Sequence, residues 1–410
     1  MLVLALLLDS SPAAADPLPL PAAPKPPELG NFVQNEAAAV QLGKALFWDT
    51  QVGSDGRTAC ATCHFHAGTD ARVRNTINPK GDGFQIAGPD GTVTAADFPF
   101  HRLADPDDTH SAVLFDTNDV VGAQGVAVAR FIDITPGVAE DRTDPFPMAG
   151  LRQVTGLNTP SVINAVFNHR NFWNGRAQFE FNGVSPFGRR DPNARVLRFD
   201  SGAGTTALVG VILTNASLAS QAVGPPNNQV EMAAEGRTFA KLGKKMLSLQ
   251  PLGRQAVAAD DSVLFGIRHP SGTGLSTSYS ALIQAAFRPE WWASGVIVDA
   301  NGNRVASPTP GSTNQFSQME FNFSLFWGLS VQLYETTLVA NQTRFDRFLA
   351  GDNNALNDQE KVGFSIFGGK GQCDKCHSGP ELTRASVAQV TGRGLVELIN
   401  LADGARGIPA

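Results

Sequence analysis

Apolar residues recur at helical spacing in three segments of the chain. The first segment, EAAAVQLGKALFWDT, begins at residue 36, and its pattern predicts a helix with one apolar face. The residues on that face are Val40, Leu42, Ala45, Leu46 and Trp48. A loop that contains glycine follows the predicted helix.

The other two predicted helices lie in the second half of the chain. In LNDQEKVGFSIFGG, Asn357 stands at the N-cap position with Glu360 three residues later, which is the pattern of a capping box. Gly368 and Gly369 are expected to end that helix. The third segment, residues 317–340, carries aromatic residues at helical spacing, and we expect it to form the core of a second domain.

Between these helices the chain is rich in Asp, Gly and Pro. Residues 75–145 and 178–220 are interpreted as loop-rich insertions, and residues 290–315 carry further Gly/Pro-rich loops. The predicted fold class is therefore mainly α with loop-rich insertions.

Composition and the N-terminus narrow the class of protein. The chain has 410 residues, 17% of them charged, and a net charge of −6 without blocks of one sign, which favours neither nucleic-acid nor anionic-membrane binding. An apolar run over residues 2–8 and three alanines at 13–15 resemble a secretory signal peptide over 1–15. A Pro-rich linker over 16–30 follows it. No stretch is long enough for a membrane span. The signal-peptide-like N-terminus leads us to expect an exported, periplasmic protein.

All four cysteines fall in two copies of Cys-x-x-Cys-His. The spacing is typical of covalent haem c attachment, in which each thiol forms a thioether to a vinyl group and the adjacent histidine ligates the iron. The residues concerned are Cys60, Cys63 and His64 in the first motif and Cys373, Cys376 and His377 in the second. Two haem c groups are therefore predicted.

The four cysteines have two alternative interpretations. An exported chain could pair four cysteines in two disulfides, but these would leave both histidines unexplained. One zinc ion could be bound by all four thiolates across the two motifs. Both motifs end in histidine and the chain looks exported, so the haem interpretation is favoured over zinc.

Four segments together resemble the bacterial di-haem cytochrome c peroxidase and MauG family. They are LGKALFWDTQVGSDGRTACATCH, LNTPSVINAVFNHRNFWNGRA, QAVGPPNNQVEM and GKGQCDKCHSGPELT. The resemblance implies two cytochrome c-like domains, each holding one covalent haem. We expect an N-terminal peroxidatic domain over 31–232, a connecting region over 233–315 and an electron-transfer domain over 316–410, which we expect to be incomplete.

The resemblance also implies functional roles for individual residues. Glu231 matches a carboxylate over the peroxide-binding face, and Pro225 matches a proline of the same distal pocket. Trp173 matches the tryptophan between the haems, and Asn158 matches an asparagine that helps to hold a calcium ion. Taken singly, Glu231 would be a helix N-terminal acid, Trp173 a core aromatic residue and Asn158 a turn residue.

The distal side of the first haem departs from the family pattern. The stretch PFPMAGLRQVTGLNTPS lacks the distal histidine of the family's peroxidases and offers only Met148, Arg152 and Gln153. We therefore expect an open first haem, as in MauG-like members. His66 is expected to contact a neighbouring haem ligand or a haem propionate. His101, His110 and His169 are the remaining candidates for a distal ligand, although a solvated loop histidine is the favoured interpretation of each.

The predicted function is reduction of hydrogen peroxide at the first haem. Electrons would come from a small cytochrome c or cupredoxin through the second haem, and the family also allows a homodimer. Two alternatives remain. One is a MauG-like or rubber-oxygenase-like enzyme that oxidises a protein or organic substrate, and the other is a non-catalytic di-haem electron carrier.

Overall fold

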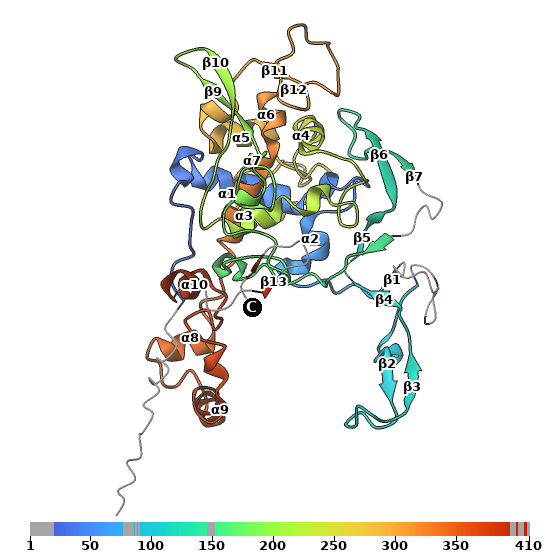
Figure 1. Cartoon of the computed structure of the whole chain (residues 1–410), viewed down its shortest axis with the longest axis vertical. Coiled ribbons are helices and arrows are strands. Elements are labelled where there is room, and N and C mark those ends of the chain that lie inside the picture. Colours follow the sequence, from blue (N-terminus) through green and yellow to red (C-terminus); the bar gives the residue numbers. More distant parts are fainter. Residues whose placement is uncertain are drawn as a thin grey trace, which may run out of the picture.

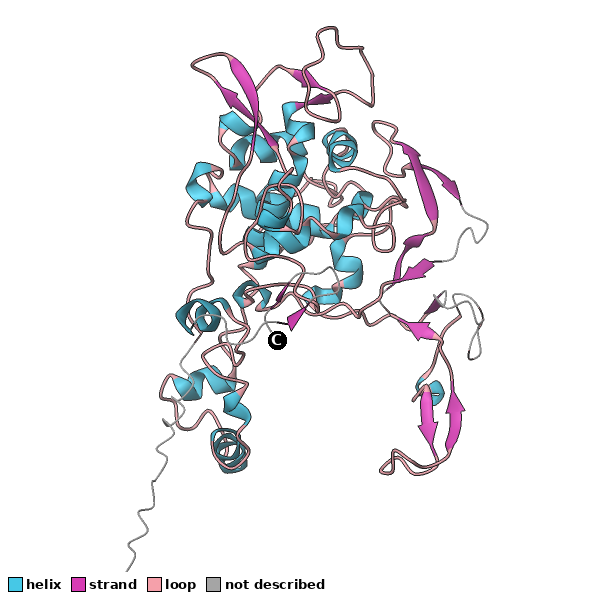
Figure 2. Ribbon diagram, in the orientation of Figure 1, coloured by secondary structure: helices cyan, strands magenta, loops and turns pink. Residues whose placement is uncertain are grey.

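The computed structural model describes residues 20–76, 86, 88, 91–122, 124–145, 152–393, 399–400 and 406–407. The predicted signal peptide and Met148 lie outside the described residues. The prediction of a mainly α fold is wrong, because only 31% of the structure is helical and 16% is strand. Helices form the centre of the molecule and strands lie around its periphery (Figure 2).

The helices within the described residues are short, and most begin at a capping side chain. They are α1 (Glu36–Trp48), α2 (Cys60–Cys63), α3 (Ser217–Ala222), α4 (Phe239–Leu247), α5 (Tyr279–Ala286), α6 (Gln318–Phe321), α7 (Phe323–Glu335), α8 (Arg344–Leu349), α9 (Asp358–Gly368) and α10 (Val387–Arg393). The predicted capping box is confirmed: the Glu360 backbone N–H donates to Asn357 Oδ1 at 2.9 Å, and the Asn357 N–H donates to Glu360 Oε2 at 2.7 Å.

The described strands pair only as two-stranded antiparallel sheets: β1–β4, β2–β3, β5–β8, β6–β7, β9–β10, β11–β12 and β13–β14. Their bounds are β1 (Asn75–Thr76), β2 (His101–Leu103), β3 (Val113–Asp116), β4 (Val120–Val121), β5 (Gln124–Ala127), β6 (Ala129–Asp133), β7 (Arg142–Pro145), β8 (Arg152–Val154), β9 (Val196–Asp200), β10 (Thr205–Val209), β11 (Ile297–Val298), β12 (Phe316–Ser317), β13 (Ile399–Asn400) and β14 (Arg406–Gly407). Most lie in the two segments interpreted as loop-rich insertions, which is why the fold-class prediction failed.

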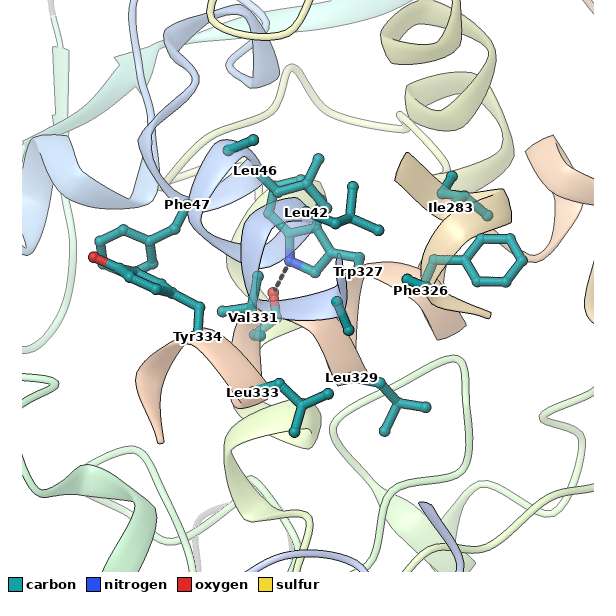
Figure 3. Packing of buried hydrophobic residues seen from close by; sticks show 14 of the residues in the cluster. Leu42, Leu46, Phe47, Ile283, Phe326, Trp327, Leu329, Val331, Leu333 and Tyr334 are labelled. Carbon is teal, nitrogen blue, oxygen red and sulfur yellow. Dashed lines mark hydrogen bonds between the residues drawn. The ribbon is translucent and has the colours of Figure 1, made fainter. Parts of the chain in front are cut away.

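The main core is built where α1 crosses α7 (Figure 1). Gly43 makes the crossing close, because a Cβ atom at that position would lie 1.9 Å from the carbonyl oxygen of Ser330. Around it, Leu42 of α1 packs with Trp327 of α7, and Phe47 of α1 packs with Tyr334 of α7 (Figure 3). Burying each such side chain contributes about 1.5–3 kcal/mol.

The helix expected in the core of a second domain occupies a different place. Every residue of α7 is buried, and the helix packs against α1 and α3, which belong to the predicted N-terminal domain. The second motif instead belongs to a small group formed by α8, α9 and α10 at one end of the molecule (Figure 1). Phe364 of α9 packs there against Phe345 and Phe348 of α8, with ring centroids 5.4 and 5.8 Å away.

A buried ion cluster joins the first insertion to the core. Asp141 accepts from Arg237 and contacts Lys245, both at 2.8 Å, and all three side chains are fully buried. The Ser54 hydroxyl donates to the same carboxylate at 2.6 Å. The cluster fixes the chain just before the first Cys-x-x-Cys-His motif. Within the part of the chain that the structure describes, every helix is too short or too polar to traverse a lipid bilayer.

Candidate active site

The first motif forms α2, a single helical turn at the end of the α1 loop. Cys60 and Cys63 are three residues apart and therefore lie on one side of this turn. Cys60 packs against the main hydrophobic core, and Arg72 Nη2 lies 3.3 Å from Cys63 Sγ. Burial raises the pKa of the Cys63 thiol to about 11 and also raises the pKa of Cys60. Both groups are thus neutral thiols beside an apolar surface.

His64 follows the helical turn and is held in one orientation. Its Nδ1 lies 2.8 Å from the carbonyl oxygen of Pro160, which sets Nδ1 as the donor and leaves Nε2 free to bind a metal. Phe47 lies beside the imidazole, with 6.1 Å between ring centroids. Burial lowers the pKa of His64 to about 4, so the ring is neutral near pH 7, as an iron ligand must be.

Glu231 is brought close to the first motif from a distant part of the sequence. The Asn228 side chain accepts from the Val230 N–H at 2.8 Å, and the Glu231 carbonyl accepts from Val126 of β5 at 3.0 Å. Burial raises the pKa of Glu231, and the nearby charge of Arg176 acts in the opposite direction. The Glu231 carboxylate in turn raises the pKa values of Cys60 and Cys63, so it lies near both thiols.

Three further residues lie on the rim of this region. Pro225 is half-buried and begins a short 3-10 turn that leads toward Glu231. Arg152 donates to the Gly125 carbonyl at 3.1 Å, and Gln153 donates to the Gln229 carbonyl at 2.7 Å. Arg152 and Gln153 therefore both contact backbone that lies close to Glu231.

Trp173 and Asn158 are in direct contact. The Trp173 indole N–H donates to the Asn158 carbonyl oxygen at 2.8 Å, and the tryptophan side chain is 64% exposed. No group of three or more His, Cys, Asp or Glu side chains suited to a metal occurs among the described residues. The calcium site at Asn158 therefore stays a prediction.

The second motif repeats the histidine geometry of the first. Cys373 begins a 3-10 turn after α9, and both Cys373 and Cys376 are exposed. His377 Nδ1 lies 3.1 Å from the carbonyl oxygen of Leu382, which again leaves Nε2 free. Phe367 lies beside the His377 ring at 6.3 Å between centroids.

The segment that carries Trp173 contacts the chain just after the second motif. The His169 N–H donates to the Ala385 carbonyl at 2.9 Å, and Asn168 forms an isolated antiparallel bridge with Ser386. The same segment meets the first motif at Pro160, whose carbonyl oxygen lies 2.8 Å from His64 Nδ1. Trp173 therefore lies in the stretch of chain that joins the two motif regions.

The other histidines lie in different surroundings. His101 and His110 belong to the projecting β2–β3 hairpin, where they contact Asp116 at 3.2 Å and Asp108 at 3.6 Å. His169 is stacked on Phe179 at 4.5 Å, so it is not the solvated loop histidine we expected. His66 is exposed beside Phe65 and adopts a left-handed backbone conformation.

The sequence analysis did not identify two charged residues of the site, Arg176 and Glu335. Arg176 stacks on Phe172, with its guanidinium carbon 3.7 Å from the ring centroid, and it acts electrostatically on Glu231. Arg176 could have been found from the sequence, because it lies in the FWNGRA segment that carries the family resemblance. Glu335, at the end of α7, is 1% exposed and raises the pKa of Cys60. Nothing in the sequence indicates that this carboxyl is buried.

The donor set fits haem c at both motifs. Each has two free thiols at thioether spacing and a histidine whose Nδ1 is tied to a backbone carbonyl. The first also has an apolar wall for the ring and an acid nearby. His64 and His377 would be the iron ligands, and the four cysteines would hold the two rings.

Comparison with known proteins gives consistent matches. A family model described as "Di-haem cytochrome c peroxidase" matches residues 37–117 and 124–262, more than half of the chain. Cytochrome-c peroxidase IdrP2 of Denitromonas iodatirespirans is 41% identical over 20% of this chain and 22% of that protein. Cytochrome c551 peroxidase of Pseudomonas aeruginosa is 27% identical over 55% of this chain and 37% of that protein.

A third relative is not named as a peroxidase. Methylamine utilization protein MauG of Methylorubrum extorquens is 42% identical over 11% of this chain and 13% of that protein. In each of these three comparisons, the chain covers well under half of the relative's length.

Proposed function

The chain belongs to the di-haem cytochrome c peroxidase family, and we propose that it reduces hydrogen peroxide to water at its first motif. Family membership implies haem c as the cofactor, and the two motifs would hold one haem each. When bound, the first haem supplies an iron centre that binds peroxide and exchanges electrons with it. The observation that carries the proposal is the half-buried acid Glu231 beside the first motif.

Glu231 would move the proton on which the reaction depends. Peroxide reduction needs a proton taken from one oxygen and delivered to the other as the O–O bond breaks. Burial raises the pKa of this carboxyl group toward the working pH. The group can then accept a proton in one step and release it in the next, whereas an exposed carboxyl group stays ionised near neutral pH. Arg176, which acts against that shift, would keep a share of Glu231 ionised.

Electrons would enter at the second motif from a small redox protein such as a cytochrome c or a cupredoxin. The exposed surface of Cys373 and Cys376 supports docking close to that motif. Trp173 would help to carry electrons onward, because its segment joins the two regions. The covalent attachment motifs and the apolar N-terminus support a periplasmic location for the reaction.

The test uses the haem-loaded full chain with a reduced small cytochrome c. Donor oxidation after addition of peroxide is followed in the wild type, in Glu231→Gln and in the control Glu235→Gln, an exposed acid four residues away. We expect fast turnover in the wild type and the control, and loss of a factor of about 10²–10⁴ in Glu231→Gln. Equal rates in all three proteins would refute the role of Glu231.

Oxidation of another substrate at an open first haem is the second candidate. It is supported by the similarity to MauG and by the absence of a histidine from the stretch before Asn158. A high-spin ferric first haem without peroxidase turnover would favour this candidate. Two six-coordinate irons without turnover would favour a plain electron carrier.

A further inference from the structure

A row of aromatic rings leads from His64 of the first motif through α1 to α7. Phe47 lies 6.1 Å from the His64 ring, and Tyr334 lies 5.5 Å from Phe47, measured between centroids. The Trp48 indole N–H then donates to the Tyr334 hydroxyl at 2.9 Å. Figure 3 shows Phe47 of α1 and Tyr334 of α7 lying against each other.

The row runs from the interior to the surface and is held rigidly. Phe47 is 1% exposed and Tyr334 is 4% exposed, whereas Trp48 is only partly buried. Both elements that carry the rings are fixed by the close crossing of α1 and α7 at Gly43. The ring-to-ring distances are therefore set by close packing and not by mobile side chains.

The chemistry of these residues suits the passage of electrons. Tryptophan and tyrosine are the side chains that most readily lose one electron and one proton, and a phenylalanine between them and a metal ligand shortens each tunnelling step. The indole-to-phenol hydrogen bond couples the two oxidisable groups. Lys44, whose Nζ lies 6.0 Å from the Tyr334 ring, is neutralised by Asp261 at 2.8 Å.

We propose that Trp48 and Tyr334 form an electron reserve for the first haem site, connected to His64 through Phe47. The proposal rests on the proposed peroxidase function and adds a second electron source to it. Hydrogen peroxide takes up two electrons and two protons to give two water molecules. When the donor protein is absent, one of these electrons would come by way of the second motif, and the Trp48–Tyr334 pair would give the other.

The pair gives up one electron to the first site and one proton to water. It is left as an organic radical and is restored by one electron from a one-electron reductant and one proton from water. Reserve electrons of this kind protect a peroxidase, because oxidising equivalents leave the haem before they attack its surroundings. The surface end at Trp48 is where the reductant would act.

The experiment uses the haem-loaded full chain with its second haem reduced by one electron. One equivalent of peroxide is added without donor, and the sample is frozen for electron paramagnetic resonance. Peptide mass spectrometry then locates oxidised side chains. We expect an organic radical in the wild type and oxidation at Trp48. We expect loss of most of that signal in Trp48→Phe and a changed spectrum in Tyr334→Phe.

Trp292→Phe is the matched control, because Trp292 is also half-buried and also donates its indole N–H, to the Phe287 carbonyl at 2.9 Å. It should keep the wild-type radical. The proposal is overturned if Trp48→Phe gives the same radical signal as the wild type. It is also overturned if the signal is lost only in Trp173→Phe. Both substitutions at the pair keep an aromatic ring in place, and a retained ring preserves the packing of the core.

Failure of the relay is distinguishable from failure of the peroxidase function. Peroxide consumption with reduced cytochrome c is measured on the same preparation. Consumption without oxidation at Trp48 overturns the relay alone. If peroxide is not consumed, the one-electron oxidant hexachloroiridate replaces it in a Trp173→Phe background, which removes the 64% exposed tryptophan. Oxidation that maps to the half-buried Trp292 before Trp48 then overturns the relay.

Discussion

Glu335 offers the sharpest test of the electrostatics around the first motif. Its side chain is 1% exposed, and its Oε2 atom is buried without a hydrogen-bond partner in the structure. Burial raises the pKa of this carboxyl from 4.5 to about 8. We predict that Glu335→Gln makes the protein more stable than the wild type near neutral pH, because glutamine keeps the shape and cannot ionise.

The sign follows from the direction of the shift. The folded pKa lies above the unfolded one, so the stability contribution of the protonated acid is complete below pH 4.5 and is lost as the pH rises toward about 8. With these two values, the wild type loses roughly 2.5 kcal/mol relative to Glu335→Gln between about pH 5 and about pH 7.

The assay is guanidinium unfolding of the haem-loaded protein at these two pH values, followed by circular dichroism. Glu360→Gln is the control, because that exposed carboxyl is bound by the Asn357 N–H and by Arg344, and its pKa is lowered. The Glu360→Gln control should therefore be less stable than the wild type. Raising the pH should not make this control more stable relative to the wild type, as it should for Glu335→Gln. A stability difference between wild type and Glu335→Gln that is independent of pH would refute the reasoning.

Three further predictions concern packing, charge and catalysis. Gly43→Ala should lower the free energy of unfolding by about 1–3 kcal/mol, since its Cβ would lie 1.9 Å from Ser330 O, and an unchanged melting temperature would contradict this. Arg237→Met should cost about 3–5 kcal/mol in denaturant unfolding, because Asp141 loses a buried partner; a neutral result would show that Lys245 alone suffices. Peroxidase activity should fall as the pH drops through the raised pKa of Glu231, because the protonated acid cannot accept a proton, and Glu231→Gln should lack this acid limb in a pH–rate profile.

Local signals in the sequence were read correctly where the cause is local. The helix before the second motif begins after Asn357 and ends at Gly368, as its capping box and paired glycines predict. The helix before the first motif spans Glu36–Trp48, and Leu42 and Leu46 of its predicted apolar face are fully buried. Caps and helical periodicity involve neighbours within one or two turns, so a single sequence carries them.

The β-hairpins were missed because their strands give no alternating pattern. In β2 and β3 most side chains are exposed on both sides, so apolar and polar residues do not alternate with a buried face. The placement of α7 was missed for the opposite reason. All of its residues are buried, so its sequence presents no polar face that would show which neighbours it packs against.

The sequence by itself predicts the attachment chemistry of this protein. Two thiols and a histidine within five residues are fixed relative to one another by covalent geometry, whatever the rest of the chain does. Only the tertiary structure decided what surrounds each motif. It placed Glu231 near Cys60 and Cys63, buried Glu335 beside the same motif and aligned Phe47, Tyr334 and Trp48 behind His64. Those contacts join segments far apart in the chain, and long-range packing sets them.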